Sequence, residues 1–243
     1  MSSVSSKAAL DLLVRRLERI GRLSDEERRA VENLPAKIQT LRARQDIVLD
    51  KEKPEHSCLI VEGWAYRYKL LGQGRRQILS FHVPGDVPDL HSLHIETMDH
   101  SLGALTGATI AFISHEALLN VTRRFPSLAG ILWRETLIDA ATFRQWIAGM
   151  GQRDGLGRMA HLLCELYCKL EAIGLAAEHR CTLPITQSEL GDALGLSGVH
   201  TNRVLQEMRA RSLIEYRARS LNITDWNGLV QVAEFDPSYL QLG

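Results

Sequence analysis

Cysteines are few in this chain, and long apolar runs are absent. Four cysteines are scattered over 243 residues, which does not predict a disulfide-stabilised fold. No run of about 18 apolar residues occurs, so no membrane-spanning helix is expected. The first nine residues are rich in serine and lack the basic end and apolar stretch of a signal peptide. These absences predict a soluble, reduced, cytoplasmic protein without a membrane partner.

The chain also lacks an excess of either charge. Its 29 basic and 29 acidic residues give a formal net charge of +0, with a pI near 7.1. A surface that binds nucleic acid must therefore be confined to one segment. Enzyme signatures are missing as well, because the sequence contains no nucleophile elbow, phosphate-binding loop or His-Glu zinc motif. The sequence therefore does not predict an enzyme.

Three patterns of hydrophobic residues follow one another along the chain. Residues 7–33 have helical spacing and predict two short helices, the second opened by a capping box of Ser24 and Glu27. Residues 36–113 form short runs rich in β-branched and aromatic residues, separated by glycine and proline turns. That pattern favours a β-sandwich or barrel. Helical spacing then returns, and its longest stretch is 128–150.

This stretch predicts a long amphipathic helix without a partner in the β part of the chain. Such a helix often pairs with its own copy across a two-fold axis, and packing on the β domain is the alternative. Four glycines within residues 149–157 predict a hinge after it, and we place a domain boundary there. The expected dimer contacts are Ile131, Leu132, Glu135, Ile138, Thr142, Gln145 and Trp146.

Residues 183–224 carry the most informative pattern. Thr186 and Glu189 form a second capping box that opens a helix, and Gly195 suits the left-handed residue that ends it. Ser197 can cap the helix that follows. Two helices joined by a short glycine turn form a helix-turn-helix, whose second helix fits the major groove of DNA.

The second of these helices has an apolar and a polar side. The apolar side is expected to bury Val204, Leu205 and Met208, and the polar side carries Asn202, Arg203 and Gln206. Arg203 can fork onto the O6 and N7 atoms of a guanine. Two short strands near residues 213–224 predict a wing on the DNA backbone. From Ser197 to Thr224 five arginines stand against two glutamates, which makes this segment locally positive.

Three runs resemble the Crp/Fnr family of transcription regulators. TQSELGDALGLSGVHTNRVLQEMRARSLI is similar to the family's helix-turn-helix signature, and VEGWAYRYKLLGQGRRQILSFHVPGD is similar to its β-roll. GRMAHLLCELY resembles the first helix of its DNA-binding domain. The resemblance covers nearly the whole chain, with the three runs in the family's order.

The resemblance implies an α+β fold in three parts. These are a jelly-roll-like β-roll sensor domain of the cyclic-nucleotide-binding type over 1–126, a dimerisation helix over 127–151, and a winged helix-turn-helix domain over 152–243. It also implies a homodimer on an inverted-repeat operator, with the two recognition helices in major grooves roughly 34 Å apart. Double-stranded DNA and RNA polymerase are the partners expected of such an activator.

Matched by position, Arg203 corresponds to the family's base-reading arginine. Val199 stands where the best-known members carry glutamate, and Asn202 where they carry glycine or serine. This pattern is more similar to a subset of the family from alphaproteobacteria, so the familiar half-site is not expected. The candidate DNA contacts are Thr186, Gln187, Ser188, Ser197, Val199, His200, Asn202, Arg203, Gln206, Arg217, Arg219 and Ser220.

The sensor half lacks the family's known ligand signatures. Members that bind cyclic AMP hold its phosphate with an arginine and a glutamate, but no Lys or Arg lies between Gln77 and Thr122 here. Oxygen-sensing members hold an iron–sulfur cluster with N-terminal cysteines, and the first cysteine here is Cys58. We therefore expect neither a cyclic nucleotide nor an iron–sulfur cluster.

Histidines and one cysteine remain as candidates for sensing. A group of histidines could support one face of a metal or haem site, although hydrogen-bonded or surface histidines explain the pattern equally simply. We therefore predict no metal and no other cofactor. Cys181, just ahead of the helix-turn-helix, is the candidate for redox modulation, which would require exposure and a lowered pKa. The histidines of this group are His82, His91, His94, His100 and His115.

The alternative function is a β-roll regulatory module that binds a ligand and docks on a protein partner instead of DNA. The turn at Gly195 and the arginines of the wing favour DNA, because a helix that docks on protein does not need that combination.

Overall fold

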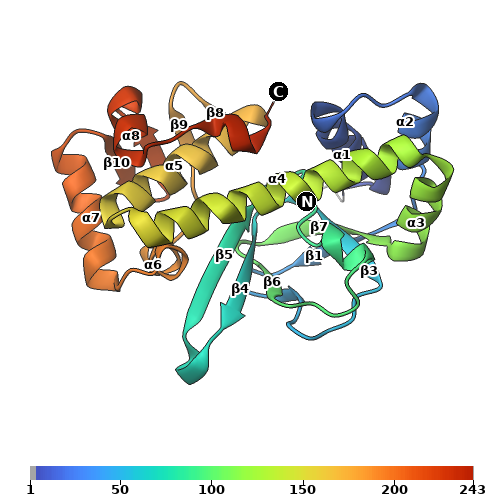
Figure 1. Cartoon of the computed structure of the whole chain (residues 1–243), viewed down its shortest axis with the longest axis horizontal. Coiled ribbons are helices and arrows are strands. Elements are labelled where there is room, and N and C mark those ends of the chain that lie inside the picture. The colour runs from blue at the N-terminus through green and yellow to red at the C-terminus, as the bar shows by residue number, and fades with distance from the viewer. Residues whose placement is uncertain (1–3, 243) are drawn as a thin grey trace. The chain divides into compact units, whose positions relative to one another are not determined.

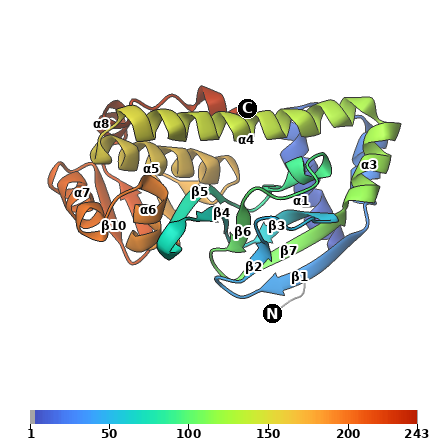
Figure 2. The same cartoon turned by 60° about the horizontal axis from the view of Figure 1, so that its bottom comes forward.

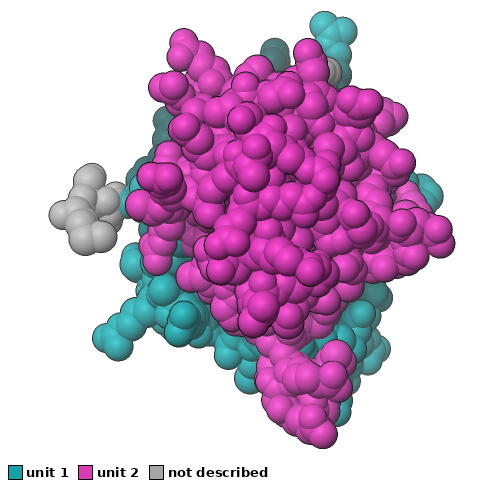
Figure 3. Space-filling model, turned by 90° about the vertical axis from the view of Figure 1, so that its left-hand side faces the viewer, with its two compact units in different colours: residues 1–69, 80–139, 243 teal, residues 70–79, 140–242 magenta. Residues whose placement is uncertain are grey.

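The computed structural model describes residues 4–242, so the first three residues of the expected sensor domain and Gly243 lie outside it. The chain divides into two compact units, coloured separately in Figure 3. Unit 1 comprises the residues up to Lys69 and Ser80–Asp139, and unit 2 comprises Leu70–Leu79 and Ala140–Leu242. The division therefore falls inside the long helix, whereas the sequence placed boundaries at its two ends.

Unit 1 begins with two short helices, α1 (Ser6–Ile20) and α2 (Asp25–Glu32). The hydroxyl of Ser5 caps α1, and the expected capping box of Ser24 and Glu27 is present at α2. The apolar face of α1 is buried in the hydrophobic core of unit 1. These local signals in the sequence were therefore sufficient to locate both helices.

Two antiparallel sheets form the β part of the chain (Figures 1 and 2). One has the order β1-β7-β3 and the other β2-β6-β4-β5. Ile60 on β3 pairs with Ile110 on β7, and neither is exposed to solvent, so the strand pattern marks the core correctly. The bounds are β1 (Ala36–Leu41), β2 (Asp46–Val48), β3 (His56–Glu62), β4 (Ala65–Leu70), η1 (Gly72–Gly74), β5 (Arg76–His82), η2 (Leu90–Leu93), β6 (Ser101–Ala104) and β7 (Ala108–Ser114).

Helix α3 (His115–Arg124) follows, and then the long helix α4 (Pro126–Gln152), which Figure 1 shows as one continuous element. The hinge predicted from the glycines of residues 149–157 is shorter than expected. Gly149 and Gly151 lie inside α4, because a glycine costs a helix only about 1 kcal/mol relative to alanine and does not end it. The break is confined to the two residues before α5 (Gly155–Ala172), which Asp154 caps by accepting from the amide of Gly157.

The rest of unit 2 is a small helical bundle with a four-stranded sheet of order β10-β11-β9-β8. The sequence predicts α6, α7 and the last two strands, but it does not predict β8, β9 or α8. Strands of two and three residues are too short to show an alternation of apolar and polar residues, so β8 and β9 cannot be predicted from the sequence. The bounds are β8 (Ala176–Ala177), β9 (Arg180–Thr182), α6 (Gln187–Leu194), α7 (Gly198–Ala210), β10 (Ile214–Arg217), β11 (Ser220–Ile223), α8 (Trp226–Ala233) and η3 (Pro237–Leu240).

Among the described residues, no helix has both the length and the apolar character needed to cross a bilayer.

Candidate nucleic-acid interface

Helices α6 and α7 meet at a tight turn. The amide of Glu189 donates to the Thr186 hydroxyl and the Glu189 carboxylate accepts from the Thr186 amide, which completes the expected capping box. Helix α6 ends at Gly195, whose φ of +64° is left-handed. A Cβ on Gly191 would lie 2.8 Å from the carbonyl oxygen of Leu196. Glycine at both positions therefore lets the two helices approach each other closely.

Helix α7 presents one buried and one exposed face. Ser197 caps it by accepting from the amide of His200 at 3.3 Å, as the sequence predicted. The buried positions are Thr201, Val204, Leu205 and Met208. The exposed positions from Val199 onward to the third turn are Val199, Asn202, Arg203 and Gln206.

These four exposed residues form a row, which we call the α7 row. Their spacing of three, one and three residues puts them on one side of the helix. Val199 is 85% exposed, so its apolar side chain is available for contact with a partner. Arg203 makes no hydrogen bond or ion pair with any other described residue, so its five N–H donors remain available.

Two of the predicted DNA contacts are placed differently. His200 is half-buried, and its ring lies within 3.0 Å of where a Cβ on Gly155 would stand, so it packs on the start of α5. The Thr186 hydroxyl donates to Glu189 at 2.9 Å and is already engaged in the capping box. The α7 row therefore excludes His200, and the α6 end offers the exposed Gln187 and Ser188 rather than the Thr186 hydroxyl.

Strands β10 and β11 form the predicted wing. Ala218 and Arg219 both have positive φ values, 48° and 67°, between the paired residues Arg217 and Ser220. This is the geometry of a two-residue hairpin turn that matches the twist of the strands. The wing is fixed in unit 2 because the Tyr216 hydroxyl donates to the carbonyl oxygen of Ile185 at 2.7 Å. Arg217, Arg219 and Ser220 are all exposed at its tip.

The positive surface is smaller than the count of arginines suggested. Arg209 donates to the carbonyl oxygen of Tyr216 at 3.0 Å, and Arg211 is 2.5 Å from the carboxylate of Glu207. Those two side chains therefore support the fold of the wing and the end of α7. The arginines left for a phosphate or a base are Arg203, Arg217 and Arg219.

A hairpin that belongs to unit 2, residues 70–79, holds α6 from outside the helical bundle. Both Nε and Nη2 of Arg76 donate to Asp192 Oδ2, at 3.0 and 2.7 Å. The side-chain amide of Gln77 donates to the carbonyl oxygen of Ala193 at 3.2 Å. This contact could not be predicted from the sequence, because more than a hundred residues separate the partners.

The structure places most of the expected dimer contacts on α4 against their own chain. Ile131, Leu132 and Ile138 belong to the hydrophobic core of unit 1, and Glu135 pairs with Arg16 at 2.8 Å. Thr142 is buried, Gln145 is half-buried, and Trp146 donates to the carboxylate of Glu165. Six of these seven residues, all but Gln145, therefore face their own chain. The sequence pattern shows which side of a helix is apolar but not which partner covers it.

A second apolar face of α4 is exposed instead. Trp133, Leu137 and Ile147 are 69%, 50% and 71% exposed. Together with Ala140 and Arg144 they repeat at spacings of four, three, four and three residues. This is the spacing of the residues that form the seam of a coiled coil. We call these five residues the α4 stripe.

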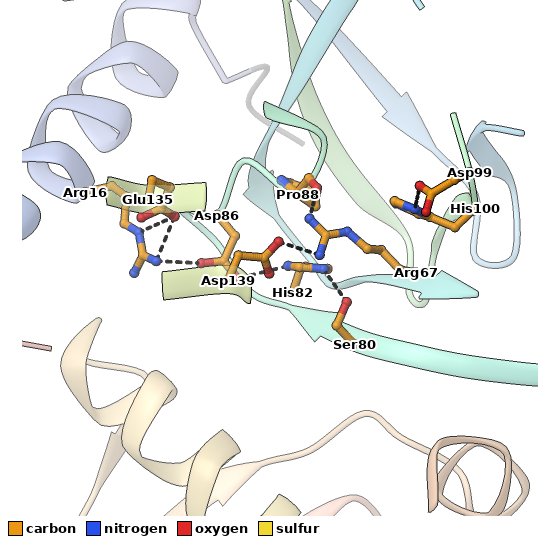
Figure 4. Close-up of polar contacts among 10 residues, drawn as sticks. All are labelled: Arg16, Arg67, Ser80, His82, Asp86, Pro88, Asp99, His100, Glu135 and Asp139. Carbon is orange, nitrogen blue, oxygen red and sulfur yellow. Dashed lines mark hydrogen bonds and ion pairs between the residues drawn. The ribbon is translucent and has the colours of Figure 1, made fainter. Parts of the chain in front are cut away.

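A buried arginine that the sequence did not single out lies inside unit 1. Figure 4 shows Arg67, on β4, directed at Asp139 of α4 and at the carbonyl of Pro88. Its Nη1 is 2.6 Å from the Asp139 carboxylate, and the residue is 2% exposed. Arg67 lies outside the segment between Gln77 and Thr122 in which a phosphate-binding arginine was expected. Because Arg67 is already paired, an anionic ligand would have to displace Asp139.

Cys181 does not meet the conditions for redox sensing. It lies on β9 with 7% of its surface exposed, and burial raises the pKa of its thiol to about 12. A thiol of this kind carries almost no thiolate near neutral pH, so it is a poor nucleophile.

Comparison with known proteins assigns both halves of the chain. Residues 157–232 match the Crp-like helix-turn-helix domain, and residues 38–125 match the cyclic nucleotide-binding domain. The nitrogen fixation regulation protein FixK of Rhizobium meliloti is 27% identical over 78% of this chain and 83% of its own. The transcriptional activator protein FnrA of Stutzerimonas stutzeri is 26% identical over 73% of this chain and 72% of its own.

A solved structure has the same fold. FixK2 from Bradyrhizobium japonicum superposes with a TM-score of 0.75 at 24% identity, covering 82% of this chain and 98% of the other. The match includes the β part and the helix-turn-helix together, which agrees with the fold class expected from the sequence. Because both domain matches occur in this one chain and its relatives are regulators of this type, the chain belongs to the Crp/Fnr family. The members of this family are transcription regulators and not enzymes.

Proposed function

We propose that the protein is a sequence-specific transcription regulator that binds an inverted-repeat operator as a homodimer. The α7 row is the main support for this proposal. Its side chains are exposed along one side of α7, and the turn at Gly191 and Gly195 fixes α7 against α6. The wing supports it by adding Arg217 and Arg219 beside the helix-turn-helix, where phosphate contacts are expected.

The experiment that tests this function is selection of binding sites from random duplex DNA with the purified full-length protein. The expected product is a pair of identical half-sites in inverted orientation, with centres about 10 base pairs or a multiple apart. Retention of random DNA without enrichment of any motif would contradict sequence-specific recognition.

Each member of the α7 row suits a different feature of the base pairs. Arg203 can donate two hydrogen bonds to the O6 and N7 atoms of guanine, and Asn202 or Gln206 can pair with adenine in the same way. Val199 has no hydrogen-bonding group and suits the methyl group of thymine. The half-site is therefore expected to contain a guanine opposite Arg203 and a thymine near the start of α7.

The expected contact between Val199 and a thymine methyl group can be tested by changing the DNA. Replacing the contacted thymine by deoxyuridine removes one methyl group, and affinity should fall about fourfold, as expected for about 0.8 kcal/mol of lost burial. Val199→Ala should lose most of this sensitivity to the methyl group. Fluorescence anisotropy with the two duplexes and the two proteins measures the coupling. An equal loss for both proteins would show that Val199 does not contact that methyl group.

The α4 stripe is the surface that we propose for the homodimer. It runs along a helix of 27 residues, about 40 Å at 1.5 Å per residue, which is long enough for a stable two-helix seam. Two copies of one chain would place the same residues opposite each other, as two-fold symmetry requires.

The expected outcome of operator binding is activation through RNA polymerase in the bacterial cytoplasm. The name of FnrA, a transcriptional activator, supports activation, and the name of FixK supports a role in regulation. We do not expect a cyclic nucleotide as effector, because Arg67 is paired with Asp139. We do not expect an iron–sulfur cluster either, because the first cysteine in the sequence is Cys58.

A further inference from the structure

The five histidines that the sequence singled out fall into two groups. His82 Nε2 lies 2.7 Å from the Ser80 hydroxyl, and His115 Nε2 lies 3.0 Å from the Ser92 hydroxyl. His94 is exposed to solvent. These three have a hydrogen-bond partner or water, so their positions are explained without a ligand.

His91 and His100 form the second group. His91 lies on η2 and His100 directly precedes β6, and their ring centroids are 5.2 Å apart. The Nε2 atoms of both are buried and have no hydrogen-bond partner among the residues of the described chain. His100 as a whole is only 6% exposed. Burial of a polar atom without a hydrogen-bond partner is unfavourable, and two such atoms in adjacent rings indicate that a ligand binds there.

A carboxylate completes this cluster. His100 Nδ1 lies 2.7 Å from Asp99 Oδ1, as Figure 4 shows. In metal sites a carboxylate on one ring nitrogen orients the imidazole and leaves the other nitrogen for the ion. Here Asp99 Oδ1 takes that role, and the second oxygen of the same carboxylate is left to bind the ion itself. The side chain of Asp99 is 77% exposed, so the cluster can be reached from solvent.

We propose that His91, Asp99 and His100 bind a divalent first-row transition metal ion. Each residue offers one ligand atom, and these atoms all lie within 4.8 Å of one another. Two imidazole nitrogens with a carboxylate suit ions such as Zn²⁺, Co²⁺ and Ni²⁺, and not Mg²⁺ or Ca²⁺, which prefer oxygen ligands. Three protein groups leave at least one coordination position for water or a small ligand.

The surroundings of the cluster agree with this assignment. Burial lowers the pKa of His91 to about 4, with a contribution from Arg67, and burial lowers the pKa of His100 as well. Both shifts favour the neutral imidazole, which is the form that binds a metal ion. The charge of Arg67 opposes a second cation nearby, but Arg67 is paired with Asp139 at 2.6 Å and Asp99 adds a negative charge at the cluster itself.

Titration with Co²⁺ tests the proposal. The untagged full-length protein is treated with a chelator, dialysed, and titrated while its visible absorption is recorded; Zn²⁺ is then added as competitor. The expected result is one Co²⁺ per protomer with a visible band that Zn²⁺ removes. His91→Ala and His100→Ala should each lower the affinity about 100-fold or more, and Asp99→Asn about 10- to 100-fold.

His94→Ala is the matched control, because it removes an exposed histidine three residues from His91 and should leave the affinity unchanged. Thermal unfolding without metal checks that each variant folds. Should His100→Ala fail to fold, Asp99→Asn decides, since that side chain is exposed. Absence of a band at one equivalent, or equal affinity in all folded variants, would overturn the proposal. Because the readout does not involve DNA, neither result bears on the operator.

Discussion

Replacing Leu137 by aspartate should separate the dimer and lower operator affinity about 100-fold or more. Leu137 lies in the middle of the α4 stripe and is 50% exposed, so a carboxylate there does not disturb the core of its own chain. In a two-fold dimer it would lie opposite its own copy, where two buried charges repel each other. Separate protomers also lose the simultaneous contact with two half-sites, which contributes about 10²- to 10⁴-fold to affinity.

Leu175→Asp provides the matched control. Leu175 is 52% exposed, lies outside α4, and undergoes the same chemical change. Sedimentation should report a monomer for Leu137→Asp and a dimer for Leu175→Asp. In gel-shift titrations at one salt concentration, Leu137→Asp should lose operator affinity and Leu175→Asp should keep it. A dimer that survives Leu137→Asp would place the interface on another surface.

The helix-turn-helix could be predicted from the sequence because its signals are local. The capping box of Thr186 and Glu189, the left-handed Gly195 and the Ser197 cap all lie within twelve residues, and the structure contains each of them. Backbone hydrogen-bonding at helix ends depends on neighbouring residues, so a short stretch of sequence determines it. His200 shows the limit, because its contact with Gly155 depends on a helix that starts forty-five residues earlier.

The dimer surface could not be predicted in the same way. Helix α4 has two apolar sides, and hydrophobic spacing gives no indication of which side its own chain covers. Ile131 and Ile138 pack in the core of unit 1, while Trp133 and Leu137 remain exposed. Only the arrangement of α1 and the sheets against α4 distinguishes the two sides.

Residues that approach each other from distant parts of the chain were the hardest to predict. Arg67 and Asp139 are separated by more than seventy residues, and nothing near Arg67 in the sequence marks it as buried. The histidines were noticed as a group, but burial and hydrogen bonding separate His91 and His100 from the others. Long-range pairing of this kind depends on topology, and composition and periodicity carry little information about it.

Arg203→Ala should remove about 1–3 kcal/mol of specific binding, roughly 5- to 150-fold, and relax the preference at one base pair of each half-site. Its side chain is exposed on the α7 row and has no other described residue as a partner, so the substitution leaves the fold of unit 2 intact. Arg203→Lys should restore the charge but not the preference, because an ammonium group cannot make the forked pair of hydrogen bonds with guanine.

Arg211→Ala is the control for Arg203→Ala, since it removes the same charge from the same segment. Arg211 is paired with Glu207, so its loss should weaken binding to all DNA slightly and leave base preference unchanged. Competition between the operator and single-base variants, at one fixed salt concentration, separates the two effects. If Arg203→Ala and Arg211→Ala reduced affinity equally for every duplex, Arg203 would be a phosphate contact. The reading of guanine would then have to be assigned to another member of the α7 row.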